Sequence, residues 1–286
     1  IHPVNVRVGG FHRVPTRREL LAVVPALALA LALALATLRW VAGFDFPDLR
    51  HDGELVALRQ PGEYPIIRGR LASTGGLDIA PHEFEDHVVE EHVERSTALH
   101  AHLRDGGRYL VGPLARYSLN AGELSAVAAA AAVEAGLGAV ERNPFRSIVV
   151  RAVEVVEACE EALALVAAYE EPDRPAVPVE PRRAVGSGWT EAPRGLLFSR
   201  YALDDDGTIL SARIVPPTAQ NQAAIEADVR RFVETNLALD DDALRHGAEV
   251  ATRNHDPCIS CAPHFLHVTD ERRSAPRRRW SSASAT

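Results

Sequence analysis

The segment at residues 20–38 constrains the fold more than any other, because its nineteen residues carry no charge and consist mainly of Ala and Leu. A helix of this length could cross a membrane. Pro25 interrupts the run, however, and weakly apolar Ala makes up much of it. Ala and Leu alternate, so a helix here has no single apolar face, which predicts burial on all sides in a protein core. A membrane span and an uncleaved signal-like segment are the alternatives.

The overall composition narrows the class of protein. With 31 Lys+Arg against 39 Asp+Glu, the net charge is −8. This balance argues against nucleic-acid binding, which depends largely on phosphate neutralisation. Three cysteines in 286 residues do not describe a secreted disulfide framework, so we expect the reducing cytoplasm. The chain contains no Met and starts at Ile1, which we interpret as a fragment of a longer protein.

A β-hairpin is predicted in the carboxy-terminal half. Residues 196–203 and 208–215 both have strand patterning, and Asp-Asp-Asp-Gly at 204–207 is typical of a turn. Arg194 and Thr218 are each twelve residues from the middle of that turn, so hairpin geometry predicts that they meet at its open end. Thr218 could also cap a helix predicted over 219–235.

Helical periodicity predicts further helices over 121–135 and 144–170, and we also interpret 83–102 as an acidic helix. Cys159 lies on the apolar stripe of the second of these and is expected to be a small buried hydrophobe.

Cys258, Cys261 and His264 form the clearest cluster of chemically active side chains. Their spacing lets one turn of backbone present two thiolates and an imidazole on one side. Thiolates favour zinc, nickel and iron over magnesium and calcium. Structural zinc sites and thiol–disulfide pairs share the Cys-x-x-Cys spacing, and chance also produces it, so the cysteine pair alone does not choose between a metal site and a redox site.

Three separated segments together resemble motifs of the large subunit of nickel–iron hydrogenases. They are Glu-Ala-Pro-Arg-Gly at 191–195, Pro-Pro-Thr-Ala-Gln-Asn at 216–221 and Asp-Pro-Cys-x-x-Cys-x-x-His at 256–264. They are most similar to the cytoplasmic, cofactor-linked members, which exchange electrons with a nicotinamide or a deazaflavin. The resemblance extends from Ile1 to about His267. It implies an α+β fold, with a predominantly helical large-subunit core and small antiparallel β elements.

The resemblance also implies an activity, the reversible oxidation of dihydrogen to protons and electrons. Residues 1–264 would be the carboxy-terminal portion of the large-subunit domain, and 265–286 an extension that a maturation endopeptidase removes. Members of the family carry an upstream Arg-x-Cys-Gly-x-Cys segment and an upstream glutamate, which this chain lacks. We therefore expect the fragment alone to be inactive and to hold no stable nickel–iron centre.

Metal ligands are implied by the same resemblance. Cys258 and Cys261 match thiolates that bind nickel, and the second also bridges to an iron that carries carbon monoxide and cyanide. His264 matches a ligand of a buried magnesium or iron ion, and the backbone carbonyl of Ile214 matches another ligand of that ion.

Residues around the metals are implied as well. Arg194 matches an arginine over the open coordination position, where it would act as a base or an electrostatic partner. Asp256 would lie beside it and either handle protons or orient that arginine. Pro193, Pro217 and Thr218 match segments that face the cyanide ligands. A guanidinium and a hydroxyl can both donate hydrogen bonds to a cyanide nitrogen.

The expected partners are other hydrogenase subunits. Two metal-spaced cysteines cannot also ligate iron–sulfur clusters, so electrons would leave through a small iron–sulfur subunit and on to diaphorase or electron-transfer subunits. The alternative function is a structural zinc-binding interaction module, made from Cys258, Cys261, His264 and one of His255 or His267. A redox Cys-x-x-Cys pair is the third possibility.

Overall fold

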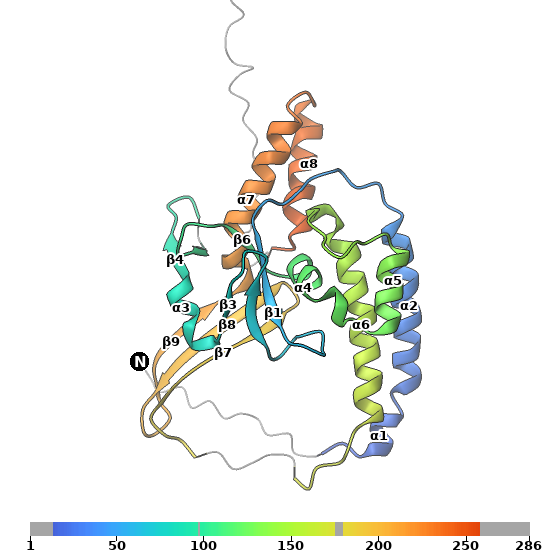
Figure 1. Cartoon of the computed structure of the whole chain (residues 1–286), viewed down its shortest axis with the longest axis vertical. Coiled ribbons are helices and arrows are strands. Elements are labelled where there is room, and N and C mark those ends of the chain that lie inside the picture. The colour runs from blue at the N-terminus through green and yellow to red at the C-terminus, as the bar shows by residue number, and fades with distance from the viewer. Residues whose placement is uncertain (1–13, 97, 175–179, 258–286) are drawn as a thin grey trace, which may run out of the picture.

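The computed structural model describes residues 14–96, 98–174 and 180–257 (Figure 1). Its helices are α1 (Arg17–Leu21), α2 (Val24–Ala42), α3 (Phe84–His87), α4 (Pro113–Asn120), α5 (Ala126–Glu134), α6 (Ser147–Ala167), α7 (Pro217–Thr235) and α8 (Asp241–Asn254). Its strands are β1 (Glu54–Arg59), β2 (Arg70–Ser73), β3 (Asp78–Ile79), β4 (Val88–His92), β5 (Leu99–Leu103), β6 (Tyr109–Leu110), β7 (Ala184–Ala192), β8 (Gly195–Leu203) and β9 (Ile209–Val215). The predicted α+β class is confirmed.

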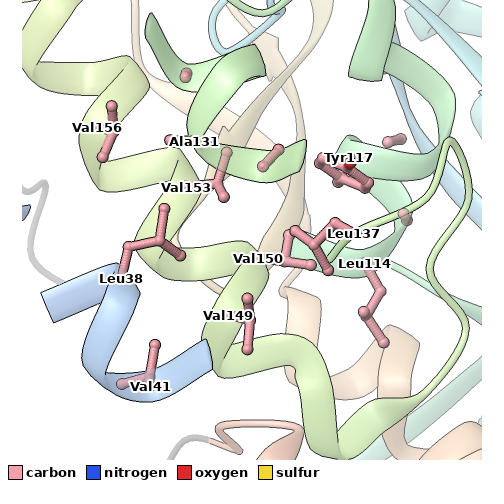
Figure 2. Packing of buried hydrophobic residues seen from close by; sticks show 14 of the residues in the cluster. Leu38, Val41, Leu114, Tyr117, Ala131, Leu137, Val149, Val150, Val153 and Val156 are labelled. Atoms are coloured by element: carbon pink, nitrogen blue, oxygen red, sulfur yellow. The ribbon is translucent and has the colours of Figure 1, made fainter. Parts of the chain in front are cut away.

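Helices α2, α5 and α6 pack together and form a large apolar core (Figures 1 and 2). Helical spacing places Val149, Val153 and Val156 of α6 on one face, and all three are fully buried. Figure 2 shows Leu38 and Val41 of α2 on the same side of α6. Burying a side chain of this size contributes about 1.5–3 kcal/mol, so this contact is a main source of stability in the helical half.

Helix α2 is apolar except for Thr37 and Arg39, but one side of it is exposed. Leu38 and Val41 are buried, whereas Leu29 and Leu33 are 62% and 59% exposed. The prediction of burial on all sides is therefore wrong for the described part of the chain, because α5 and α6 cover one face. The stretch Arg17–Ala42 is long and apolar enough to cross a membrane, a property that core helices and signal sequences share.

The strands form three sheets, ordered β3-β2-β1-β6, β4-β5 and β7-β8-β9. Strand β1 pairs antiparallel with β2 and parallel with β6. A second apolar core lies among these sheets, where the ring of Phe84 stacks on that of Phe198 with centroids 4.1 Å apart. This core joins the β7-β8-β9 sheet to the rest of the chain.

Most predicted elements are confirmed. Helices α5, α6 and α7 correspond to the predictions over 121–135, 144–170 and 219–235, and Cys159 is buried. The hairpin is also confirmed, because β8 and β9 pair from Leu203↔Ile209 to Phe198↔Val215. The sequence did not predict β7, which pairs along the whole of β8.

The helix predicted over 83–102 is wrong. The segment contains the one-turn helix α3 and then the hairpin β4–β5, in which Val88 pairs with Leu103. Val88, Ala101 and Leu103 are buried, as is His100, whereas Glu91 and His92 are exposed. The many Glu and His residues, and the lack of strict alternation between buried and exposed positions, concealed the two strands from sequence reasoning.

Candidate active site

Arg194 lies at the tip of a tight hairpin between β7 and β8. Ala192 pairs with Gly195, so Pro193 and Arg194 form a two-residue turn. The backbone at Gly112, just before α4, passes directly against this turn. A Cβ at Gly195 would lie 2.5 Å from Cγ2 of Val111, and a Cβ at Gly112 would lie 2.7 Å from the backbone oxygen of Arg194. Both glycines also have positive φ, 133° and 109°, a conformation that only glycine adopts without strain.

Arg194 contacts Asp256, so the structure brings the first and third motifs together. Nε of Arg194 donates a hydrogen bond to the backbone oxygen of Asp256 (2.8 Å), and Oδ2 of Asp256 is 3.3 Å from Nε. The two side chains are 44% and 41% exposed. An exposed ion pair contributes at most about 1 kcal/mol, so the backbone contacts of the turn must do more to locate Arg194 than this pair does.

The start of α7 is buried and polar, and it joins the sheets at the site. The fully buried Gln220 donates from Nε2 to the backbone oxygens of Leu196 (2.6 Å) and Val215 (3.1 Å). The Asn221 amide both accepts from the backbone nitrogen of Val111 (2.8 Å) and donates to its oxygen (3.1 Å). These bonds fix α7 against β6, β8 and β9.

The predicted pairing of Arg194 with Thr218 across the hairpin is not formed. The ladder between β8 and β9 stops at Phe198↔Val215, because Pro216 follows and α7 begins at Pro217. Thr218 is buried in the first turn of α7, so it lies inside the helix and does not cap it. Arg194 and Thr218 nevertheless both lie just beyond the open end of the β8–β9 hairpin.

The structure gives the positions of the other predicted site residues but does not test their roles. Pro217 is buried beside Thr218, and Ile214 lies on β9 opposite Ser199 with a half-exposed side chain. The roles assigned to them, and to Pro193, stay predictions.

Cys258, Cys261 and His264 lie outside the described residues, as does the predicted extension 265–286. Within the described ranges, no group of three His, Cys, Asp or Glu side chains is arranged to hold a metal ion. The metal-ligand predictions therefore remain untested.

A buried carboxylate holds the end of α8, immediately before the third motif. Asp228 of α7 lies between two imidazoles, with Nδ1 of His51 at 2.9 Å and Nε2 of His255 at 3.3 Å from its Oδ2. Burial disfavours the charge on Asp228, but the contacts with His255 and His51 outweigh it and lower its pKa to about 2. The engaged position of His255 argues against its use as a ligand in the alternative zinc site.

A second anchor acts on the same helix end. The backbone oxygen of Asn254 accepts hydrogen bonds from Oγ of Ser147 (2.6 Å) and from Nη2 of Arg151 (2.6 Å), both on α6. Asp256 follows with φ of 49°, the one positive value for a non-glycine residue among the described ranges. Asp tolerates this conformation better than most residues. Helices α6 and α7 thus determine where the chain enters the third motif.

Sequence reasoning missed these supporting residues. The second motif contains Gln220 and Asn221, but the resemblance implies no role for them, and the apolar periodicity predicts only that Asp228 lies in a helix. The available signal was the helical spacing of Asn221 and Asp228 with the apolar residues Ala224, Ile225 and Phe232.

Comparisons with known proteins agree with the motifs. No protein-family model matches the chain. It is 31% identical over 274 residues to sulfhydrogenase 1 subunit alpha of Pyrococcus furiosus, a match that covers 94% of this chain and 63% of that protein. It is also 30% identical over 199 residues to the NAD-reducing hydrogenase HoxS subunit beta of Cupriavidus necator, covering 65% of this chain and 41% of that protein. These relatives are hydrogenase subunits. The chain thus spans less than two thirds of the length of the curated relatives it matches.

Solved structures show the same fold. An NAD+-reducing [NiFe]-hydrogenase in the H2-reduced state superposes with a TM-score of 0.69 at 24% identity, covering 88% of this chain and 61% of that one. A reduced, active Ni-Fe-Se hydrogenase from Desulfomicrobium baculatum gives a TM-score of 0.51 at 20% identity, covering 88% and 62%.

Proposed function

We propose that this chain is the carboxy-terminal portion, residues 1–264, of the large subunit of a nickel–iron hydrogenase, which reversibly oxidises dihydrogen. The contact between Arg194 and Asp256 carries the proposal, because it joins two motifs that lie 62 residues apart at the point where the chain enters Cys258. The similarity to hydrogenase subunits over 94% of the chain supports it.

The donor set of the chain suits the proposed metals. Thiolates at Cys258 and Cys261 fit nickel, and the second would also bind an iron that carries carbon monoxide and cyanide. His264 and the carbonyl of Ile214 would ligate magnesium or iron. The other two nickel thiolates would come from a segment that this sequence does not contain. When bound, the metals would supply the Lewis acidity and the redox chemistry that oxidation of dihydrogen requires.

Arg194 and Asp256 supply complementary chemistry beside that centre. A guanidinium keeps its proton at physiological pH and presents several donors, so Arg194 would orient anionic ligands and favour negative charge that develops nearby. The carboxylate of Asp256 is half-exposed and adjoins Nε of Arg194, so it can accept a proton and pass it to solvent. Thr218, Pro193 and Pro217 would enclose the cyanide ligands.

The remaining parts of the proposal concern the assembly. A small iron–sulfur subunit would take the electrons, and diaphorase or electron-transfer subunits would pass them on. A maturation endopeptidase would remove residues 265–286. We place the enzyme in the cytoplasm, in the group linked to a soluble electron carrier.

The test uses the full-length parent protein, expressed with its partner subunits and maturation proteins. We expect nickel by elemental analysis and hydrogen-dependent reduction of a viologen dye. Cys258→Ser should abolish both, whereas Cys159→Ala, the matched change outside the motif, should leave both in place. A folded parent complex that contains neither nickel nor hydrogen-dependent activity would refute the proposal.

A further inference from the structure

Arg116 on α4 is a buried arginine whose hydrogen-bonding capacity is completely used. It is 3% exposed. Nε and Nη2 donate to the two carboxylate oxygens of Glu154 (2.7 and 2.8 Å), and Nη1 donates to Oε2 of Glu191 (3.1 Å). The two remaining N–H groups donate to the backbone oxygens of Ala192 (2.8 Å) and Pro193 (3.2 Å). A guanidinium has five N–H donors, and each has an acceptor.

We propose that Arg116 is a positioning residue that sets the location of Arg194 by holding the two consecutive carbonyls immediately before it. Only the expected effect of Arg116 on hydrogen uptake rests on the proposed function. The geometry stands without it, since a single planar group holds two consecutive peptide units of the turn that carries Arg194.

The turn is held from a second direction as well. The backbone at Gly112 lies so close to the carbonyl of Arg194 that no Cβ fits between them. This contact blocks movement of the turn toward the start of α4, while the hydrogen bonds from Arg116 oppose movement away from it. Both restraints act on the backbone, so they operate whatever side chain occupies position 194.

The charges around Arg116 explain why the residue must be arginine. Burial alone would lower the pKa of Arg116, but Glu154 and Glu191 outweigh it and raise the pKa, so the cation is retained. The hydroxyl of Tyr64 donates to Glu154 (2.8 Å), and the backbone nitrogen of Leu58 donates to Glu191 (2.9 Å), which fixes both carboxylates. Lysine has three donors on one atom and cannot span two carboxylates and two carbonyls.

A purely structural role would tie α4 to α6 and β7 without affecting Arg194. The two roles differ in what Arg116→Lys should do to the hydrogen bond between Nε of Arg194 and the backbone oxygen of Asp256. Arg146→Lys is the matched control, because Arg146 also donates to two consecutive carbonyls, those of Ala135 and Gly136, and pairs with a glutamate away from the site.

The first experiment uses the full chain without metal and records the 15N-labelled Nε–H signal of Arg194 by NMR, with its rate of exchange with water. We expect Arg116→Lys to speed this exchange at least tenfold and to shift the amide signal of Gly195. Arg146→Lys should change neither. Unchanged Arg194 signals in a folded Arg116→Lys chain, verified by circular dichroism, would overturn the positioning role.

A measurement on the unaltered chain covers the case in which Arg116→Lys does not fold. The structure requires all five guanidinium protons of Arg116 to be distinct and slow to exchange. Averaged, rapidly exchanging Nη protons would overturn the proposal without any variant.

The second experiment uses the mature parent complex. We expect Arg116→Lys to lower kcat for hydrogen uptake at least tenfold with little change in KM, and to move the infrared bands of iron-bound cyanide. Arg146→Lys should leave both close to the unaltered enzyme. If the unaltered complex is inactive, the proposed function fails, and the NMR result still decides whether Arg116 positions Arg194. An altered Arg194 signal with unchanged kcat and cyanide bands would overturn the catalytic consequence.

Discussion

Replacing Asp228 by Asn should destabilise the fold by an amount that depends on pH. The carboxylate lies between His51 and His255, and its pKa falls from an ordinary 3.8 to about 2. One pKa unit corresponds to about 1.4 kcal/mol, so the ionised group stabilises the fold by about 2.5 kcal/mol at neutral pH. Asn keeps the size of the side chain but loses the charge, and its NH2 group replaces one of the two carboxylate oxygens with a donor.

The sign of the pH dependence follows from the lowered pKa. The contribution of Asp228 is fully present above about pH 4, the pKa in the unfolded chain, and is lost as the pH falls from about 4 to about 2. The difference in unfolding free energy between the unaltered chain and Asp228→Asn should therefore be about 2–3 kcal/mol at pH 7 and shrink steadily below pH 4. Urea unfolding followed by circular dichroism at pH 7, 5, 4 and 3 measures it.

Asp52→Asn provides the control. Asp52 adjoins His51 in the sequence but is exposed and pairs with Arg231 at the surface, so its replacement should change the unfolding free energy little. A difference below about 0.5 kcal/mol for Asp228→Asn at pH 7, or one that stays constant down to pH 3, would refute the role assigned to the buried carboxylate.

The remaining predictions concern the turn and the metal site. Gly195→Ala should destabilise the chain by at least about 2 kcal/mol in urea unfolding, because the added Cβ would meet Val111 and the φ at this position is positive. Gly186→Ala, which has open space around it, should change the unfolding free energy little. Equal effects of the two changes would contradict the close approach at Gly195. Arg194→Lys should leave the melting temperature within about 2 °C, since the side chain is half-exposed, but reduce hydrogen uptake by the parent complex at least tenfold; full activity would exclude a role at the reacting centre. The present chain by itself should show no infrared bands of metal-bound carbon monoxide or cyanide, and clear bands with hydrogen uptake would mean that the missing thiolates come from another chain.

Local patterns determined what could be predicted of the fold. The β8–β9 hairpin follows from two alternating segments and an acidic turn, and α6 follows from its apolar spacing. Strand β7 carries Gly186 and Gly188 and buries few side chains, so its sequence lacks the alternation that marks a strand. It forms a strand because it pairs with β8 along its whole length.

The candidate site was predictable only in part. Arg194 and Asp256 could be named from motifs, but Arg116 could not, because its partners Glu154 and Glu191 are 38 and 75 residues away. The same limit applies to Asp228, whose imidazole at position 51 is 177 residues distant. Burial of α2 was overestimated because an apolar sequence says nothing about how many neighbours are present to cover it.

The turn that carries Arg194 has a consequence for protein engineering. Its position is set by backbone contacts at Gly112 and Gly195 and by hydrogen bonds to the carbonyls of residues 192 and 193. None of these contacts involves the side chain at 194, so other side chains placed there would project from the same Cα. Position 194 is therefore suited to comparing lysine and histidine, which can carry a positive charge, with glutamine, which cannot, at constant backbone geometry.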